Sequence, residues 1–428
     1  MTEQSPLPHV VVVGGGFGGL ATVRALADAP VRVTLVDRRV YKTFQPLLYQ
    51  VATGGLNAGD VTTWLRALRL RQKNLRVVHE HLVGIDHEDR RIRLLGGQEI
   101  GYDYLVVANG VTVNYFGTPG AEEHALGMYS RSQALKIRDQ LFIRLEQSAF
   151  AQHRDAGLRV VVVGGGPTGV EVAGALAELR TAGLAPSYPE IHGDAFEVTI
   201  VQRGTELLKT FDPALRAYAA EELARRQVTL RLGSGVAEVG PDKVVLTDGT
   251  TLPADLTVWS AGIGPHPEVD AWDLPRTEHG RVAVGDDLQV DGRPGVFAVG
   301  DIAAQADPLP QLAQPAIQGG RQAARNILAL IEGRPTEPLK YHDKGTMAVI
   351  GRRSAIAEIN VPGLRRPLRL TRATAWFAWL FVHITSLVGV RNRVTTTAGL
   401  VVRYGFRNYK RPVPIVGDVP TIRPAKTD

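Results

Sequence analysis

The sequence predicts an α/β fold built on two doubly wound parallel sheets. Two nearly identical stretches carry this prediction, VVVVGGGFGG at residues 10–19 and VVVVGGGPTG at residues 160–169. Each is typical of a buried apolar strand that breaks into a glycine turn, and each is followed by a helical pattern. Strand, glycine-rich turn and helix are the first elements of a doubly wound domain, so the repeat predicts two such domains.

The glycine spacing in both copies is that of a dinucleotide-binding turn. The first glycine makes the tight turn, the second lets the backbone approach a pyrophosphate, and the third lets the helix pack against the strand. The helix N-terminus then directs free N–H groups and a positive dipole end at the phosphates. Two copies predict two bound dinucleotides, with electrons passing between them. The binding candidates are Gly14, Gly16, Gly18 and Gly19 in the first copy and Gly164, Gly166 and Gly169 in the second.

The ends of the next strands differ between the two copies. The strand predicted in VRVTLVDRR ends at Asp37, 18 residues beyond Gly19, where a carboxylate can hold ribose hydroxyls. The corresponding strand in FEVTIVQRG ends at Gln202, which Arg203 follows. A glutamine does not repel a ribose 2′-phosphate and an arginine attracts it, so strict rejection of that phosphate is not expected at the second site.

Further elements follow from the same reading of the chain. Strands are expected in YDYLVVANG, in ADLTVWSAGI up to Gly262, and in RPGVFAVGD up to Asp301. Residues 130–151 are expected to form a connecting helix.

A length of 428 residues is too great for one hydrophobic core. No stretch reaches the ~20 uncharged apolar residues of a spanning helix, and the N-terminus lacks the pattern of a secretion signal.

The sequence contains no cysteine. Disulfides, thiolate metal sites and reactive-thiol mechanisms are therefore excluded, and no other metal site is visible. Two flavoenzyme classes with paired glycine loops, disulfide reductases and sulfide:quinone reductases, need cysteine pairs and are excluded with them.

Basic residues gather at the C-terminal end. Residues 361–428 hold twelve Lys/Arg against two Asp/Glu, which leaves the rest of the chain at a net charge of −4. The body is therefore not expected to bind nucleic acid. The uncharged run 373–390 is short for a bilayer crossing, and Trp376, Trp379 and flanking arginines suit a membrane interface with anionic head groups. A core helix and a homodimer interface are the alternatives, and His383 within the run is interpreted as structural.

With these features in place, the chain resembles the type II NADH dehydrogenases, single-subunit NADH:quinone oxidoreductases of respiratory membranes. The resemblance rests on both glycine loops, AVGD at residues 298–301, AQPAIQ at residues 313–318, and WLFVHITSLVGVRNR at residues 379–393. It spans nearly the whole chain, and the last two motifs are its most specific part.

The resemblance implies two doubly wound Rossmann-like dinucleotide-binding domains plus a small C-terminal membrane-associating region. The FAD-binding domain is expected over residues 1–115 and 265–335. The NAD(P)H-binding domain with its connecting helix is expected over residues 116–264. Residues 336–428 are expected to serve membrane association or dimerisation.

The resemblance also assigns ligands to the two loops. FAD is expected at the first, with Asp37 on the adenosine ribose, Asp301 on the ribityl chain or a phosphate-bridging water, and the backbone of Val83 near the adenine. NADH, with NADPH as an alternative, is expected at the second, where Gln202 and Gly262 join its glycines. The alternative for Asp301 is a plain helix N-cap.

Three residues are candidates for the chemistry. The resemblance places Glu171 near the nicotinamide and the flavin, the alternative being a carboxylate that only favours a helix N-terminus. Gln314 and Gln318 lie four residues apart, so a helix beginning near Pro315 would present both amides on one face. In the family this helix lines the quinone pocket; the alternative is a pair of surface or capping amides.

The expected function is transfer of a hydride from NADH to FAD and of two electrons onward to a membrane quinone, without proton pumping. The protein is expected to be peripheral, on the cytoplasmic face of the cell membrane. Two other classes stay open: a soluble flavin reductase for a protein acceptor, which leaves the aromatic tail unexplained, and a non-enzymatic NADH-responsive flavoprotein.

Overall fold

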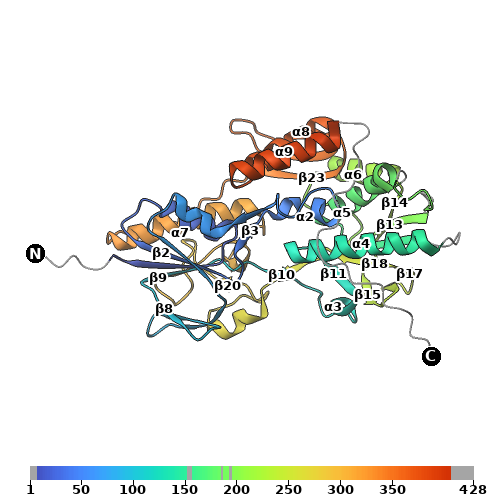
Figure 1. The fold of residues 1–428 in the computed structure, drawn as a ribbon. Coiled ribbons are helices and arrows are strands. Elements are labelled where there is room, and N and C mark those ends of the chain that lie inside the picture. The colour runs from blue at the N-terminus through green and yellow to red at the C-terminus, as the bar shows by residue number, and fades with distance from the viewer. Residues whose placement is uncertain (1–6, 152–156, 185–186, 192–194, 406–428) are drawn as a thin grey trace, which may run out of the picture. The chain divides into compact units, whose positions relative to one another are not determined.

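The computed structural model describes residues 7–151, 157–184, 187–191 and 195–405. The fold divides into two compact units, which are described separately (Figure 1). Unit 1 comprises Met1–Thr43, Thr62–Thr112 and Ile263–Lys344, and unit 2 comprises Phe44–Val61, Val113–Gly262 and Gly345–Asp428.

Unit 1 is built on a five-stranded parallel sheet with the strand order β21-β9-β1-β2-β5. Its central strand β1 is a run of valines buried on both faces, as in parallel sheets that helices cover on each side. The strands are β1 (His9–Val13), β2 (Arg32–Asp37), β5 (Leu75–His79), β9 (Tyr104–Val107) and β21 (Val296–Ala298).

Two helices pack against each other in unit 1, α1 (Phe17–Ala25) and α7 (Ala313–Ile331). Gly320 allows their close approach, because a Cβ there would lie 2.2 Å from the carbonyl oxygen of Gly18. Smaller elements complete the unit: β3 (Tyr41–Thr43), β4 (Thr62–Trp64), η2 (Leu65–Leu70), β6 (Leu82–Asp86), β7 (Arg91–Leu94), β8 (Glu99–Gly101), η5 (Pro267–Trp272), β20 (Val282–Ala283), η6 (Gly300–Ile302) and β22 (Ala303–Ala304).

Unit 2 repeats the architecture with a parallel sheet of strand order β11-β18-β12-β13-β14. The strands are β11 (Ala125–Gly127), β12 (Leu158–Val163), β13 (Phe196–Gln202), β14 (Val228–Leu232) and β18 (Leu256–Trp259). Its helices include η1 (Gln45–Leu47), α2 (Leu48–Ala52), α3 (Ala121–His124), α4 (Arg131–Ala151), α5 (Pro167–Glu178), η3 (Leu179–Leu184) and α6 (Pro213–Arg225). The two predicted parallel sheets are therefore confirmed, and so is the connecting helix.

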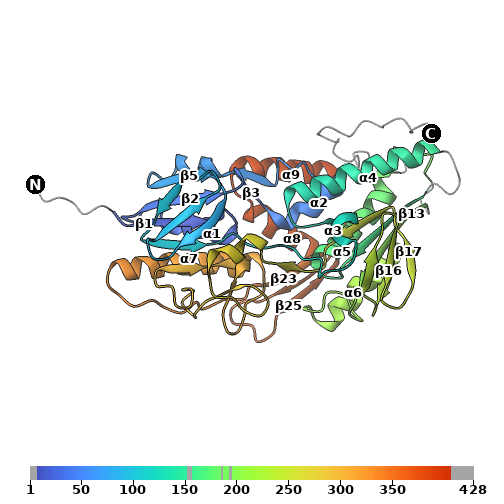
Figure 2. The ribbon, with the colours of Figure 1, turned by 90° about the horizontal axis from the view of Figure 1, so that it is seen from below.

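Antiparallel strands and two helices complete unit 2. One meander is β15 (Val236–Val239), β16 (Lys243–Leu246) and β17 (Thr251–Pro253), of which β16 and β17 lie side by side in Figure 2. The other is β23 (Gly345–Gly351), β24 (Ser354–Ile359) and β25 (Leu368–Thr371), and it leads into α8 (Arg372–Ser386) and α9 (Val390–Gly405). Among the described residues, no helix is long and apolar enough to cross a membrane.

The orientation of α8 corrects one expectation. Trp376 and Trp379 are only 5% and 3% exposed, so the prediction that these tryptophans face an interface is wrong. Their indoles are large enough to fill the space between α8 and the neighbouring parts of unit 2. Phe377 and Phe381 are instead 58% and 70% exposed. Residues 406–428 of the predicted basic tail lie outside the described residues.

We expect Gly320→Ala to lower the thermal stability, because the new methyl group would meet the Gly18 carbonyl and force α1 and α7 apart. Such overpacking costs about 1–3 kcal/mol. Gly319→Ala is the matched control on the next residue of the same helix, since its Cβ would meet only side-chain atoms at 3.6 Å or more. Thermal unfolding measures both, and equal melting temperatures for the two variants would contradict this account of the packing.

Candidate active site

The first glycine loop combines two closed positions with one open position. Gly14 has φ +102°, and a Cβ there would lie 2.3 Å from the carbonyl oxygen of Ala108. At Gly19 a Cβ would lie 1.9 Å from the carbonyl oxygen of Gly14. Gly16 has φ −73° and no atom within 4 Å of its Cβ position. The fold itself therefore requires the first and third glycines, whereas the second opens onto space that a ligand can fill.

The second loop has the same geometry. Gly164 has φ +110°, with a Cβ position 2.9 Å from the backbone nitrogen of Ala261, and a Cβ on Gly169 would lie 1.9 Å from the Gly164 carbonyl oxygen. Gly166 is open, with nothing within 4 Å of its Cβ position. Gly18 of the first loop differs, because its Cβ position meets Val299 at 3.0 Å and so serves packing.

The acceptor at the end of the second strand holds each loop in place. The Gly15 N–H donates to Asp37 Oδ2 at 2.5 Å, and the Gly165 N–H donates to Gln202 Oε1 at 2.9 Å. The Arg39 N–H occupies the other oxygen of Asp37 at 2.6 Å. Burial raises the pKa of Asp37, and the two N–H donors offset only part of this rise because they favour the ionised carboxylate. Gln202 Nε2 donates to no group among the described residues, so it is available to a ligand.

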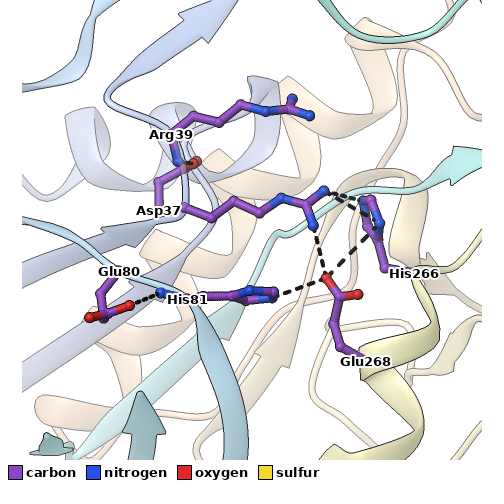
Figure 3. Close-up of polar contacts among 7 residues, drawn as sticks. Asp37, Arg39, Glu80, His81, His266 and Glu268 are labelled. Carbon is purple, nitrogen blue, oxygen red and sulfur yellow. Dashed lines mark hydrogen bonds and ion pairs between the residues drawn. The ribbon is translucent and has the colours of Figure 1, made fainter. Parts of the chain in front are cut away.

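A charged cluster borders Asp37 (Figure 3). The Arg38 guanidinium lies 3.0 Å from His266 Nε2 and 3.1 Å from Glu268 Oε1, and His81 Nε2 lies 3.4 Å from the same carboxylate oxygen. Burial, together with the charge of Arg38, lowers the pKa of His266 to about 4, so this imidazole is neutral and accepts from Arg38. The cluster fixes the chain directly after β2.

Two further predicted cofactor residues lie in unit 1. Asp301 follows β21 at the carboxyl end of the same sheet, inside the 3₁₀ turn η6 and not at a helix N-cap. Its carbonyl oxygen accepts from Arg281 Nε at 3.0 Å and from Gln311 Nε2 at 3.1 Å. Val83 is an exposed residue near the start of β6, in the meander after β5. The sheet edge therefore gathers the glycine loop, Asp37 and Asp301, the place where doubly wound sheets bind ligands.

Asn109 is a site residue that the sequence reasoning missed. Both of its side-chain polar atoms are buried, and neither has a hydrogen-bond partner among the described residues. The residue follows β9 beside the first loop, where a Cβ on Gly14 would lie 2.8 Å from the Asn109 backbone nitrogen. Leaving a buried amide unpaired costs about 1–3 kcal/mol, so this position fits a polar ligand. The sequence signal that could have indicated Asn109 is its position directly after a predicted parallel strand.

Glu171 is the fifth residue of α5 in unit 2. The Val349 N–H of β23 donates to its Oε1 at 3.4 Å. Burial raises the pKa of Glu171 to about 8, because the carboxylate loses more from desolvation than this single long hydrogen bond returns. The carboxyl group therefore carries a proton at neutral pH.

Gly262 has φ +80° and lies under the Phe116 ring, which a Cβ there would meet at 2.1 Å.

Gln314 and Gln318 lie one turn apart near the start of α7, on the helix that the sequence predicted. The Gln318 amide pairs with the main chain of His342: Nε2 donates to the carbonyl oxygen, and Oε1 accepts from the N–H, both at 3.0 Å. The Gln314 amide has no protein partner among the described residues. Gln318 therefore anchors the chain at His342, and the half-buried Gln314 amide can bond to solvent or to a ligand.

His383 on α8 is neutral. Its ring stacks on Trp379 at a centroid distance of 4.1 Å, and its Nδ1 lies 2.7 Å from the Trp379 carbonyl oxygen. Burial lowers the pKa of His383 to about 4 despite this hydrogen bond. Stacking and a local main-chain hydrogen bond agree with a structural residue.

Two parallel sheets that each present a glycine-rich turn at the carboxyl edge define a pyridine-nucleotide oxidoreductase of the two-dinucleotide class. The family model described as pyridine nucleotide-disulphide oxidoreductase matches residues 8–320. The chain is 35% identical over 423 residues to the type II NADH:quinone oxidoreductase Ndh of Mycobacterium tuberculosis, covering 94% of this chain and 89% of that protein. It is 30% identical to the type II NADH:quinone oxidoreductase of Haemophilus influenzae, covering 88% of this chain and 93% of that one.

The solved structures agree in fold. NDH2 from Plasmodium falciparum, solved in complex with NADH, superposes with a TM-score of 0.86 at 20% identity, covering 96% of this chain and all of that one. The chain belongs to the type II NADH:quinone oxidoreductases.

We expect Glu171→Gln to change how stability depends on pH. Between pH values near 4.5 and 8 the folded protein keeps a proton that the unfolded carboxyl releases, so wild-type stability falls as the pH rises through this window. The variant lacks this loss, which is on the order of a few kcal/mol. Melting temperatures measured from pH 5 to pH 9 should diverge in favour of the variant, and parallel curves would contradict a raised pKa.

Proposed function

We propose that the chain oxidises NADH at the second loop and reduces a membrane quinone, using FAD held at the first loop. The observation that carries this proposal is the pair of glycine loops, each closed at its first and third glycines and open at its second. The relatives from Mycobacterium tuberculosis and Haemophilus influenzae, both type II NADH:quinone oxidoreductases, support it.

The residues around the first loop fit FAD. Gly16 leaves room for a pyrophosphate, and Asn109 offers two polar atoms that the described protein does not satisfy. Asp37 ends β2, Asp301 follows β21 at the same sheet edge, and Val83 lies in the meander after β5. Bound FAD would supply the two-electron chemistry that links a nicotinamide to a quinone. The protein's part is to bind and orient the cofactor.

At the second loop, Gln202 sets the ribose environment. Its Oε1 is taken by Gly165, so the atom left for the ligand is the Nε2 donor. This N–H₂ group can donate to a ribose hydroxyl or to a 2′-phosphate, whereas a carboxylate would repel the phosphate. NADPH is therefore a second substrate in this proposal, with Gly164, Gly166 and Gly169 at the pyrophosphate and Gly262 at the edge of the site.

Two polar groups are assigned to quinone reduction, Glu171 as a proton donor and Gln314 as a hydrogen-bond donor. Glu171 holds a proton on its carboxyl at neutral pH and can pass it on as the quinone is reduced. Gln314 donates to a quinone carbonyl without bringing a charge into an apolar pocket. Gln318, one turn further along α7, holds the main chain of His342 in place.

The outer surfaces of α8 and α9 fit the face of an anionic membrane. Phe377 and Phe381 are exposed on α8, and α9 exposes valines at Val394 and Val401 among exposed arginines. Apolar side chains flanked by cations are typical of helices that lie in a membrane interface. In this proposal the protein binds peripherally to the cytoplasmic face of the cell membrane, and a homodimer through the same helices is the alternative.

An anaerobic absorbance titration tests the proposed function. The purified chain should show a flavin spectrum that bleaches on addition of NADH and recovers on addition of a short-chain quinone. Recovery only with a protein acceptor would point to a soluble flavin reductase. Bleaching that neither kind of acceptor reverses would point to a non-enzymatic flavoprotein.

We expect Gln202→Glu to raise KM for NADPH roughly tenfold or more and to change KM for NADH much less. Two like charges a few ångströms apart in a partly wet site cost on the order of 1–4 kcal/mol. Steady-state kinetics with both nucleotides measures the change. If the wild type already rejects NADPH as strongly as the variant does, another residue reads the ribose.

The double variant Phe377→Ser/Phe381→Ser should bind anionic vesicles at least about tenfold more weakly, since each phenylalanine contributes roughly 1.5–3 kcal/mol when it leaves water. Phe150→Ser is the matched control, because Phe150 is 88% exposed on α4. Vesicle sedimentation measures binding. Unchanged sedimentation, with conversion of a dimer to a monomer on gel filtration, would assign the helices to a dimer interface.

Gln314→Leu and Gln318→Leu should distinguish a residue that contacts the quinone from one that stabilises the fold. Losing one hydrogen bond to a neutral acceptor costs about 1 kcal/mol, so Gln314→Leu should slow quinone reduction several-fold at an unchanged melting temperature. Gln318→Leu should lower the melting temperature, because both bonds to His342 are lost. Stopped-flow reduction by NADH is the control step. A Gln314 variant that is less stable but equally fast with quinone would contradict this division.

A further inference from the structure

Lys42 on β3 is a buried cation without a balancing carboxylate. The residue is 7% exposed, and its Nζ lies 4.0 Å from the centroid of the Phe17 ring. Within the described parts of the chain, no carboxylate forms an ion pair with it. Lysines are almost never fully buried unless their charge is paired, and a cation–π contact offsets only part of the desolvation.

The surroundings make this charge more costly. Burial, and secondly the positive charge of Arg24 on α1, lower the pKa of Lys42 to about 7. Arg24 itself lies close enough to Arg321 of α7 for their charges to oppose each other. Among the described residues, the charged group that acts on Lys42 is thus a cation, Arg24, and not a carboxylate. A position of this kind is stabilised by an anion supplied from outside the chain.

The position of Phe17 shows where that anion would bind. Phe17 is the first residue of α1 and follows Gly16 directly. Lys42 Nζ thus lies over the ring of the first residue of α1, which adjoins the open Gly16 position, and the dipole of a helix attracts negative charge to this end. The open loop and the unpaired buried ammonium group are independent observations, and they point to the same turn.

We infer that Lys42 Nζ contacts the pyrophosphate of the dinucleotide at the first loop and is its counter-cation. This inference rests on the proposed function, because that function assigns FAD to this loop. Lys42 then contributes to retention of the cofactor, while the glycines provide the space for it. The bound pyrophosphate in turn restores the full charge of the ammonium group.

Flavin retention by the full-length holoprotein tests this role. A charge-assisted contact to phosphate contributes enough for Lys42→Met to raise the dissociation constant of FAD roughly tenfold to a hundredfold. Lys42→Arg keeps the charge and should stay within a few-fold of wild type. Lys73→Met is the matched control, since it removes an exposed lysine of the same unit. The fluorescence of released FAD after dilution measures all four proteins.

Thermal unfolding adds a readout that a purely structural lysine would not give. In the flavin-free full chain, Lys42→Met should melt at a higher temperature than wild type, because an unpaired buried charge has been removed. Addition of FAD should raise the melting temperature of the variant less than that of wild type. Inorganic pyrophosphate should stabilise the flavin-free wild type and not the variant.

Equal dissociation constants for wild type and Lys42→Met would overturn the inference. So would equal weakening in Lys42→Met and Lys42→Arg together with a lower melting temperature of both flavin-free variants, since the side chain would then serve packing alone. A wild-type chain that binds no FAD would instead overturn the proposed function, so the two failures are distinguishable.

Discussion

One hydrogen bond in each unit governs the rest of the site: a glycine N–H in the loop donates to an acceptor at the end of the second strand. In unit 1 the pair is Gly15 and Asp37, and in unit 2 it is Gly165 and Gln202. This bond fixes the loop so that its second glycine faces open space, and it decides which atoms of the acceptor are left for a ligand. The carboxylate leaves lone pairs, whereas the amide leaves an N–H₂ donor. One fold, used twice, thereby presents different hydrogen-bonding atoms at the ends of its two second strands.

Sequence patterns were sufficient to predict the frame. A run of valines ending in glycines can form little other than a buried parallel strand and a tight turn, so both sheets and the helices after them could be predicted. Periodicity also placed Gln314 and Gln318 on one helix. It could not show that the Gln318 amide is taken by His342, because that pairing joins residues 24 apart across a loop.

Burial explains what the sequence could not predict. Trp376 and Phe377 are neighbours of similar character, yet the phase of α8 turns one inward and the other outward. Burial also shifts the pKa of Glu171 upward and the pKa of Lys42 downward, and the residues that bury these two groups are distant in sequence. Asn109 belongs to this group too, since only the fold shows that its amide is buried and unsatisfied. In each case the decisive quantity is the packing around the side chain, which a local pattern does not contain.

If the two open glycines serve two different dinucleotides, as proposed, the flavin content of two loop variants will differ. Gly16 and Gly166 have negative φ and no protein atom within 4 Å of their Cβ positions, so the Cβ added by Gly16→Val or Gly166→Val enters open space. Flavin per chain, measured after acid release, should be close to wild type for Gly166→Val and nearly absent for Gly16→Val. Loss of flavin in both variants, or in Gly166→Val alone, would contradict the account.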